Sequence, residues 1–163
     1  MKKFILIRHA KSAWDQPFLQ DHDRPLAERG LKDAPKMAQR LKKKGIYPDL
    51  MVSSTATRAL ETAKITVKEL GYSKKEIKAD AHLYHASPQA ILKIMRMQPD
   101  SVSTLFLFGH NPGLNEVIEY LGGKIDNLPT SGQFGFYLEA DSWEELSPER
   151  VKVWFLDFPK NKS

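Results

Sequence analysis

Short apolar runs alternate along the chain with longer segments in which apolar residues recur at helical spacing. A short apolar run is typical of a buried strand, and the longer spacing is typical of an amphipathic helix that covers a sheet. This alternation predicts an α/β fold, a three-layer sandwich with a mostly parallel central sheet flanked by helices. The strand-like runs are residues 3–7, 50–52, 77–79, 104–108, 134–138 and 151–155.

Four segments between these runs have the helical spacing. The first covers residues 27–41, and because Pro35 removes a backbone donor inside it, we expect this helix to start late or to bend. The third begins at Ser87 and Pro88, which suit a helix N-cap and the first helical position. The remaining two helices are predicted over residues 56–70 and 114–121.

The length and composition are those of one globular unit. A chain of 163 residues, with 41% hydrophobic and 28% charged residues, is near the usual size of a domain. We see no linker and no internal repeat, so we expect a single domain over residues 1–163. Basic residues exceed acidic residues by 25 to 20, a net charge of +5. We interpret this excess as solvated surface charge and expect no nucleic-acid partner.

Two absences narrow the choice of chemistry and location. The sequence has no cysteine, which excludes disulfides, thiolate metal sites and a cysteine nucleophile. No apolar segment approaches the roughly 20 residues needed to span a bilayer. The apolar start is interpreted as a strand, because Arg8 and His9 end it too early for a signal peptide. We therefore expect a cytoplasmic protein with no membrane partner.

Basic side chains follow three of the predicted strands. Arg8 and His9 come directly after the first strand, and His110 follows the strand over residues 104–108. Arg58 lies a short step into the helix that follows the second strand. Ligands of open α/β sheets bind beyond the carboxyl ends of the strands. We therefore expect these four side chains to converge.

Each of these features has a purely structural alternative. An Arg-His pair is common by chance, and Arg58 at the start of a helix is ordinarily a solvated side chain. The segment from Gly109 to Gly113 contains Asn, Pro and Gly, all of which suit a tight turn for backbone reasons. The coincidence of all three features at strand ends favours a site.

The chemistry of these residue types points to a phosphoryl group. Arginine presents a planar fork of donors that matches phosphate oxygens. A histidine with an ordinary pKa of about 6.5 is largely neutral near pH 7, so His9 can attack phosphorus as a nucleophile. Arg8, Arg58 and His110 can then hold the charge that develops on the phosphoryl oxygens. This scheme needs no metal and no cofactor.

Several motifs in order along the chain carry a family resemblance. They are Ile7-Arg8-His9-Ala10-Lys11, Asp23-Arg24-Pro25-Leu26, Glu28-Arg29-Gly30, Ser53-Ser54, Arg58-Ala59, Glu61-Thr62-Ala63 and Phe108-Gly109-His110-Asn111-Pro112. With them the chain resembles the histidine phosphatase superfamily, the phosphoglycerate-mutase-like group, and within it the SixA-type phosphohistidine phosphatases. The resemblance covers almost the whole chain. It implies a phosphoglycerate-mutase-like fold, His9 as the nucleophile, and a phosphate pocket of Arg8, Arg58 and His110.

Two positions depart from the family pattern. The usual glycine after the Arg-His pair is Ala10, as in the SixA-like branch. Many relatives place a glutamate proton donor where this chain has His85. We expect a helper role for His85, either protonating a leaving group or orienting substrate; the structural alternative is a partly buried histidine bonded to backbone. Loss of the carboxylic acid favours phosphohistidine, whose imidazole leaving group needs less help than an alkoxide.

The leading functional hypothesis is a metal-independent protein phosphohistidine phosphatase. Short connections argue against a mutase whose insertions enclose a small substrate, and an open pocket favours a phosphorylated protein as partner. The first alternative is a phosphatase of the same superfamily that acts on a small phosphorylated metabolite. The second is a noncatalytic module that binds phosphate or nucleic acid, an alternative that only the excess of basic residues supports.

Overall fold

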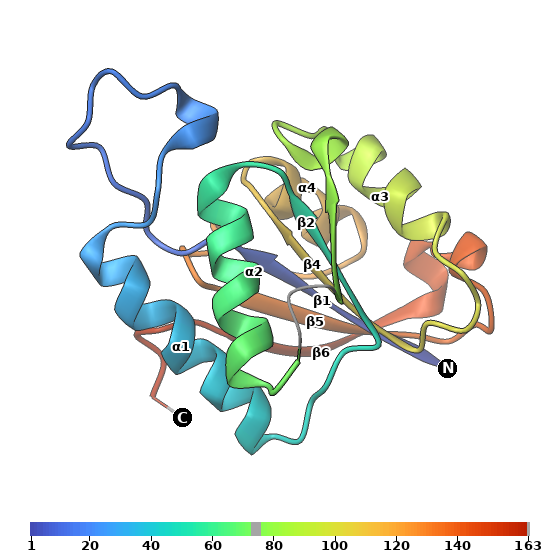
Figure 1. The fold of residues 1–163 in the computed structure, drawn as a ribbon. Coiled ribbons are helices and arrows are strands. Elements are labelled where there is room, and N and C mark those ends of the chain that lie inside the picture. Colours follow the sequence, from blue (N-terminus) through green and yellow to red (C-terminus); the bar gives the residue numbers. More distant parts are fainter. Residues whose placement is uncertain (73–75, 163) are drawn as a thin grey trace.

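The predicted α/β sandwich is confirmed by a computed structural model, which describes residues 1–72 and 76–162 (Figure 1). All six predicted strands are present, and each is longer at one or both ends than its apolar run. The polar residues at the strand ends therefore belong to the sheet or adjoin it directly. The strands are β1 (Lys2–Arg8), β2 (Leu50–Ser54), β3 (Ile77–Asp80), β4 (Thr104–Gly109), β5 (Gln133–Leu138) and β6 (Val151–Asp157).

The strands form one mostly parallel sheet in the order β3-β2-β4-β1-β5-β6. β1 lies in its centre and pairs in parallel with β4. β5 is antiparallel to both of its neighbours, β1 and β6. The carboxyl ends of β1, β2 and β4 therefore meet at the same edge of the sheet, as predicted from the sequence.

Four α-helices occur among the described residues: α1 (Glu28–Lys43), α2 (Thr57–Glu69), α3 (Pro88–Arg96) and α4 (Gly113–Tyr120). The expected late start of the first helix is wrong, because α1 begins at Glu28 and continues through Pro35. A proline costs one backbone hydrogen bond. The buried face of this helix, which includes Met37 and Leu41, offsets that cost by packing against the sheet.

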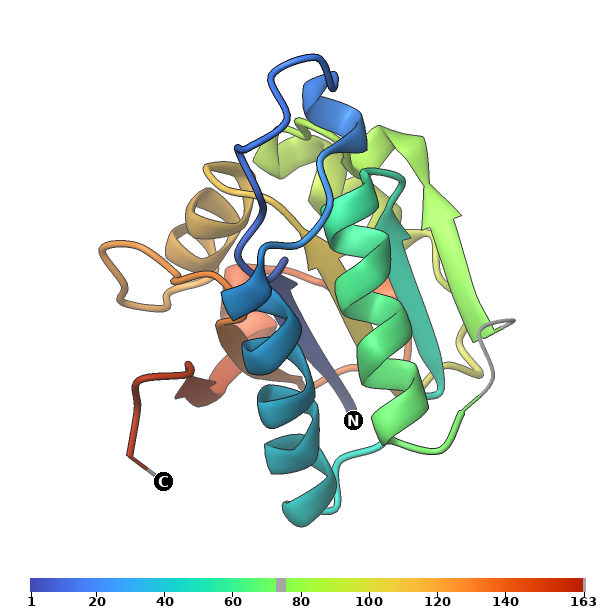
Figure 2. The same cartoon turned by 60° about the vertical axis from the view of Figure 1, so that its left-hand side comes forward.

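Alternate residues of the central strands face two separate cores, which gives the sandwich its three layers. On β1, Ile5 and Ile7 pack in the core with residues of α1 and α2. Phe4 and Leu6 point the other way, into the core with residues of α3 and α4. Figures 1 and 2 show the two helix pairs on opposite faces of the sheet. Burial on both faces explains why these strands are continuous apolar runs.

A long loop between β1 and α1 extends beyond the carboxyl edge of the sheet, where Figure 2 shows it above the start of α2. Its two ends are joined, since Ser12 and Leu26 form an antiparallel bridge and the Ala27 N–H donates to the Lys11 carbonyl at 2.8 Å. Gly30 allows α1 to pack closely against Lys11, because a Cβ there would lie 2.2 Å from the Lys11 oxygen. The loop is thus clamped at its base.

No helix of the described residues is long and apolar enough to cross a bilayer.

Candidate active site

The carboxyl edge of the sheet contains a hollow of about 230 Å³. β1 delivers Arg8 and His9 to it, β4 is followed by His110, and the first turn of α2 contributes Arg58. His85, from the segment before α3, also lines it. The structure thus brings together all five residues that the sequence singled out.

His9 presents one ring nitrogen to this hollow. The side chain is only 7% exposed, and its Nδ1 lies 2.8 Å from the Ala10 carbonyl oxygen. Because a carbonyl only accepts, Nδ1 carries the proton and Nε2 keeps its lone pair. Burial is the main cause that lowers the pKa of His9 to about 4, and the charges of Arg58 and Arg8 add to it. The ring is therefore a neutral base at ordinary pH.

His110 lies next to His9, with the two ring centroids 5.2 Å apart. Its Nε2 is 2.8 Å from the Ser54 hydroxyl, and its buried Nδ1 has no hydrogen-bond partner among the described residues. Burial, followed by the nearby His9 and Arg58, lowers the pKa of His110 to about 3. If the Ser54 hydroxyl donates to Nε2, the proton of this neutral ring is on Nδ1, available to an anion.

Arg8 and Arg58 are anchored so that part of each guanidinium stays unpaired. Arg8 donates from Nη1 to the Leu128 carbonyl at 2.9 Å. Arg58 donates from Nη1 to the Asp21 carbonyl at 2.7 Å and from Nη2 to the Asp21 carboxylate at 3.0 Å. The buried Nε of each arginine has no partner among the described residues. Buried donors are rarely left unpaired, so the pair is suited to an anionic ligand.

Asp21 is the principal site residue that sequence reasoning missed. Its carboxylate accepts from Arg58, from Arg24 at 3.1 Å and from the Tyr84 hydroxyl at 2.6 Å. These donors, Tyr84 foremost, hold the pKa of Asp21 well below its usual range. The carboxylate is therefore ionised, which makes it an anchor for the arginines rather than a proton donor. Asp21 begins a single turn of 3-10 helix (Asp21–Asp23) within the loop between β1 and α1, and no periodic pattern marks so short an element.

Arg24 adds a third guanidinium to the lining of the hollow. It donates to the Ser12 hydroxyl at 2.7 Å, and its guanidinium carbon lies 3.5 Å from the ring centroid of the exposed Trp14. Stacking and hydrogen bonding both orient its planar fork. Arg24 belongs to one of the family motifs, and that membership is the signal in the sequence for its place in the pocket.

His85 is positioned at the mouth of the hollow rather than inside it. Its side chain is 66% exposed, and its Nε2 lies 3.6 Å from the Asp21 carboxylate. The residue has a φ of 52°, which is uncommon for a non-glycine residue. The expected alternative of a partly buried histidine bonded to backbone is wrong, because the ring is exposed and its polar neighbour is a carboxylate.

One threonine links the two elements that carry His9 and Arg58. The Thr62 hydroxyl accepts from the backbone N–H of Ala10 at 2.9 Å. The same hydroxyl donates to the Arg58 carbonyl at 2.8 Å. The end of β1 and the first turn of α2 are thus joined through a single buried side chain, which holds the distance between the nucleophile candidate and the arginine.

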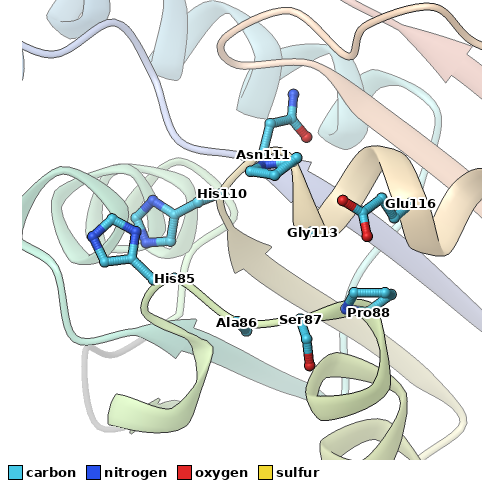
Figure 3. Close-up of a pocket in the computed structure, with 9 residues that line it drawn as sticks. His85, Ala86, Ser87, Pro88, His110, Asn111, Gly113 and Glu116 are labelled. Atoms are coloured by element: carbon cyan, nitrogen blue, oxygen red, sulfur yellow. The ribbon is translucent and has the colours of Figure 1, made fainter.

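A second hollow, of about 300 Å³, adjoins the first (Figure 3). His85, His110 and Asn111 line both hollows. Figure 3 shows the two histidines at one end of it and Glu116, from α4, at the other. A group attached to a phosphoryl bound beside His9 therefore has space in this direction.

The donor set is not that of a metal centre. Within residues 1–72 and 76–162, no three histidine, aspartate or glutamate side chains are grouped so that they could hold a metal ion. The lining of the first hollow has arginines, a lysine and histidines, and no carboxylate among the described residues. This surplus of positive charge suits a phosphoryl anion.

Comparisons with known proteins agree with this geometry. The family model of the histidine phosphatase superfamily (branch 1) matches residues 4–85. An uncharacterized chloroplastic protein of Arabidopsis thaliana is 35% identical over 153 residues, 88% of this chain and 70% of its own length. An uncharacterized protein of Mycobacterium tuberculosis is 32% identical and covers 87% of this chain and 92% of its own.

Among solved structures, the provisionally named phosphohistidine phosphatase SixA from Agrobacterium tumefaciens superposes with a TM-score of 0.82. It is 27% identical, and the match covers 97% of this chain and 98% of that chain. The chain therefore belongs to the histidine phosphatase superfamily (branch 1), and it is a phosphatase whose fold is of the SixA type.

Proposed function

We propose that this phosphatase removes the phosphoryl group from phosphohistidine side chains of proteins, with His9 as the nucleophile. The observation that carries the proposal is the state of His9, a buried neutral ring whose Nδ1–H donates to the Ala10 carbonyl. Its Nε2 has no hydrogen-bond partner in the described part of the chain, and the ring lines a hollow together with Arg8, Arg24 and Arg58. A nucleophile activated in this way needs no additional base.

The reaction proceeds in two transfers. In the first, His9 Nε2 forms a bond to phosphorus while the bond from phosphorus to the nitrogen of the substrate breaks, and the leaving imidazole takes up a proton from solvent or from His85. In the second, water attacks the phosphohistidine of the enzyme, which releases inorganic phosphate and restores neutral His9. Arg8, Arg58 and His110 hold the phosphoryl oxygens in both steps.

The few groups of the pocket that could donate a proton support a substrate whose leaving group is a nitrogen. Asp21 is the carboxylate nearest to the arginines, and its lowered pKa keeps it ionised. His85 is therefore the remaining candidate proton donor from the predicted set, and it is exposed to solvent. Departure of an imidazole needs less acid catalysis than departure of an alkoxide. The similarity to a provisionally named SixA phosphohistidine phosphatase points to the same substrate class.

Trapping the covalent intermediate tests the nucleophile. The protein is mixed with a radiolabelled phosphohistidine peptide and quenched in base, and we expect label on the protein that is stable to base and released by acid. His9→Ala should carry no label. His82→Ala is the matched control, since His82 is 87% exposed and is bonded to Asp80 outside the hollow. Wild-type turnover in His9→Ala would show that the assignment is wrong.

Substrate comparison tests the specificity. We expect kcat/KM for a phosphohistidine peptide to exceed that for every member of a panel of sugar phosphates by at least about 10²-fold, on the order of 3 kcal/mol. A sugar phosphate that matches the peptide would favour the small-molecule phosphomonoesterase instead.

A further inference from the structure

The phosphoryl hollow does not end at His85 and His110. It opens into the second hollow through the shared residues His85, His110 and Asn111. The second hollow in turn shares Pro88 and Glu116 with a third, also of about 300 Å³, between α3 and α4. The second and third hollows together form the α3–α4 groove, bordered by Pro88, Leu92 and Arg96 on one side and Gly113, Glu116 and Tyr120 on the other.

We propose that the α3–α4 groove binds the polypeptide next to the phosphorylated side chain and selects a basic residue there through Glu116. The proposal rests on the proposed function and specifies its substrate class. Glu116, the residue on which the proposal depends, has no part in the phosphoryl transfer itself.

The size of the groove favours a polypeptide over a small metabolite. Each of its two hollows is at least as large as the one that takes the phosphoryl group, about 300 Å³ against about 230 Å³. An extended chain advances by roughly 3.3–3.6 Å per residue, so successive residues can occupy successive hollows. A substrate of a few heavy atoms would contact only the first of them.

The backbone of the groove floor is held in place by close packing. A Cβ at Gly113 would lie 2.4 Å from the carbonyl oxygen of Ala86, so only glycine allows the start of α4 to approach this segment. Arg96 donates twice to the Leu146 carbonyl, at 3.1 and 2.9 Å, which anchors the far end of α3. The groove is therefore a formed surface and needs no rearrangement to accept a chain.

The carboxylate of Glu116 indicates which residue of the substrate the groove prefers. Glu116 lines both hollows and is the one carboxylate in their lining among the described residues, whereas the cation Arg96 lines only the third hollow and donates to the Leu146 carbonyl. Figure 3 shows its carboxylate directed into the space between Pro88 and Asn111. The phosphoryl hollow beside it is strongly basic, so the two regions together are complementary to a phosphoryl anion followed by a cation. A lysine or arginine a short distance from the phosphohistidine meets this requirement.

The proposal is tested with two peptides of opposite charge and with variants that remove or reverse the charge of Glu116. Two phosphohistidine peptides differ only in carrying lysine or glutamate at the positions beside the phosphohistidine, and kcat/KM is measured for each. We expect wild type to prefer the lysine peptide about five- to tenfold, the effect of one ion pair of about 1 kcal/mol in water. Glu116→Gln should abolish this preference and Glu116→Lys should reverse it.

Glu119→Gln is the matched control, because Glu119 is also an exposed glutamate of α4 and does not line the groove. It should keep the wild-type preference. The preference is a ratio within one variant, so a partial loss of folded protein does not affect it. Equal preferences in wild type, Glu116→Gln and Glu119→Gln would show that Glu116 does not select a basic residue. That result would leave the proposed function unaffected. Hydrolysis of p-nitrophenyl phosphate without turnover of either peptide would overturn both the groove and the proposed function.

Discussion

The ring centroids of His9 and His110 lie 5.2 Å apart, with the ring planes tilted by 51°, in a pocket where neither ring is easily protonated. Each is buried, and a positive charge on one ring disfavours a positive charge on the other. In the proposed reaction, the pair would supply a nucleophile, His9, and a phosphate-binding group, His110, both neutral.

We predict that both rings stay neutral through the range near pH 5 to 8, in which an ordinary histidine titrates. The pKa of His9 is lowered to about 4 and that of His110 to about 3, so activity should be lost only as the pH falls toward about 4 and Nε2 of His9 is protonated. NMR titration of the ring protons measures this directly, with a histidine peptide in the same buffer as reference. Midpoints near that of the peptide would contradict the prediction.

Arg58→Lys should lower kcat/KM by about 10²-fold or more, although it preserves the charge. Lysine has no planar fork, so it cannot contact Asp21 twice and still offer a donor to phosphate. Steady-state kinetics with p-nitrophenyl phosphate measures the effect. Arg29→Lys is the control, since Arg29 is exposed on α1 and pairs with Asp33. Equal rates in the two variants would mean that Arg58 is an ordinary surface charge.

Asp21→Asn should lower kcat/KM about tenfold, because the carboxylate that aligns Arg58 and Arg24 loses its charge and part of its accepting capacity. The same kinetic assay applies, and Asp23→Asn is the control, since the Asp23 side chain is 60% exposed. A rate above wild type would instead show that Asp21 competes with substrate for the arginines.

His85→Ala should slow hydrolysis of an alkyl phosphate by about tenfold and that of an aryl phosphate by about twofold or less. An alkoxide needs a proton as it leaves, whereas a phenolate needs little help. His82→Ala controls for loss of an exposed imidazole outside the hollow. Equal losses on the two esters would remove His85 from the mechanism.

Thr62→Val should lower the free energy of unfolding by about 1–3 kcal/mol, because the buried Ala10 N–H loses its acceptor. Thr66→Val is the matched control: its hydroxyl donates only to the Thr62 carbonyl one turn earlier, so no N–H is left unpaired. Urea denaturation followed by circular dichroism compares the two. A loss no greater than that of Thr66→Val would refute the linking role.

Much of the site could be predicted because regular elements deliver it. Arg8 and His9 end a buried strand, and a parallel sheet aligns such ends at one edge, so their meeting with His110 follows from the topology. Arg58 follows in the same way from its place in the first turn of α2.

Asp21, Tyr84 and the α3–α4 groove could not be predicted in this way. Asp21 reaches the arginines from a loop whose path depends on tertiary contacts, and no pattern of spacing encodes such a path. The groove depends on the close approach of Gly113 to Ala86, two segments that are distant in sequence from the strand that holds His9. The helix start at Glu28 differs from the expected late start because burial of one face of α1 outweighs the cost of Pro35.

The contacts that join the two ends of the loop between Lys11 and Ala27 do not involve the tip of the loop. The bridge between Ser12 and Leu26 keeps the loop ends together whatever lies between them. The tip residues Phe18 and Leu19 are 99% and 37% exposed, so changes there leave the base unstrained. The tip can therefore change in sequence and length while the end of β1, which brings Arg8 to the pocket, keeps its place.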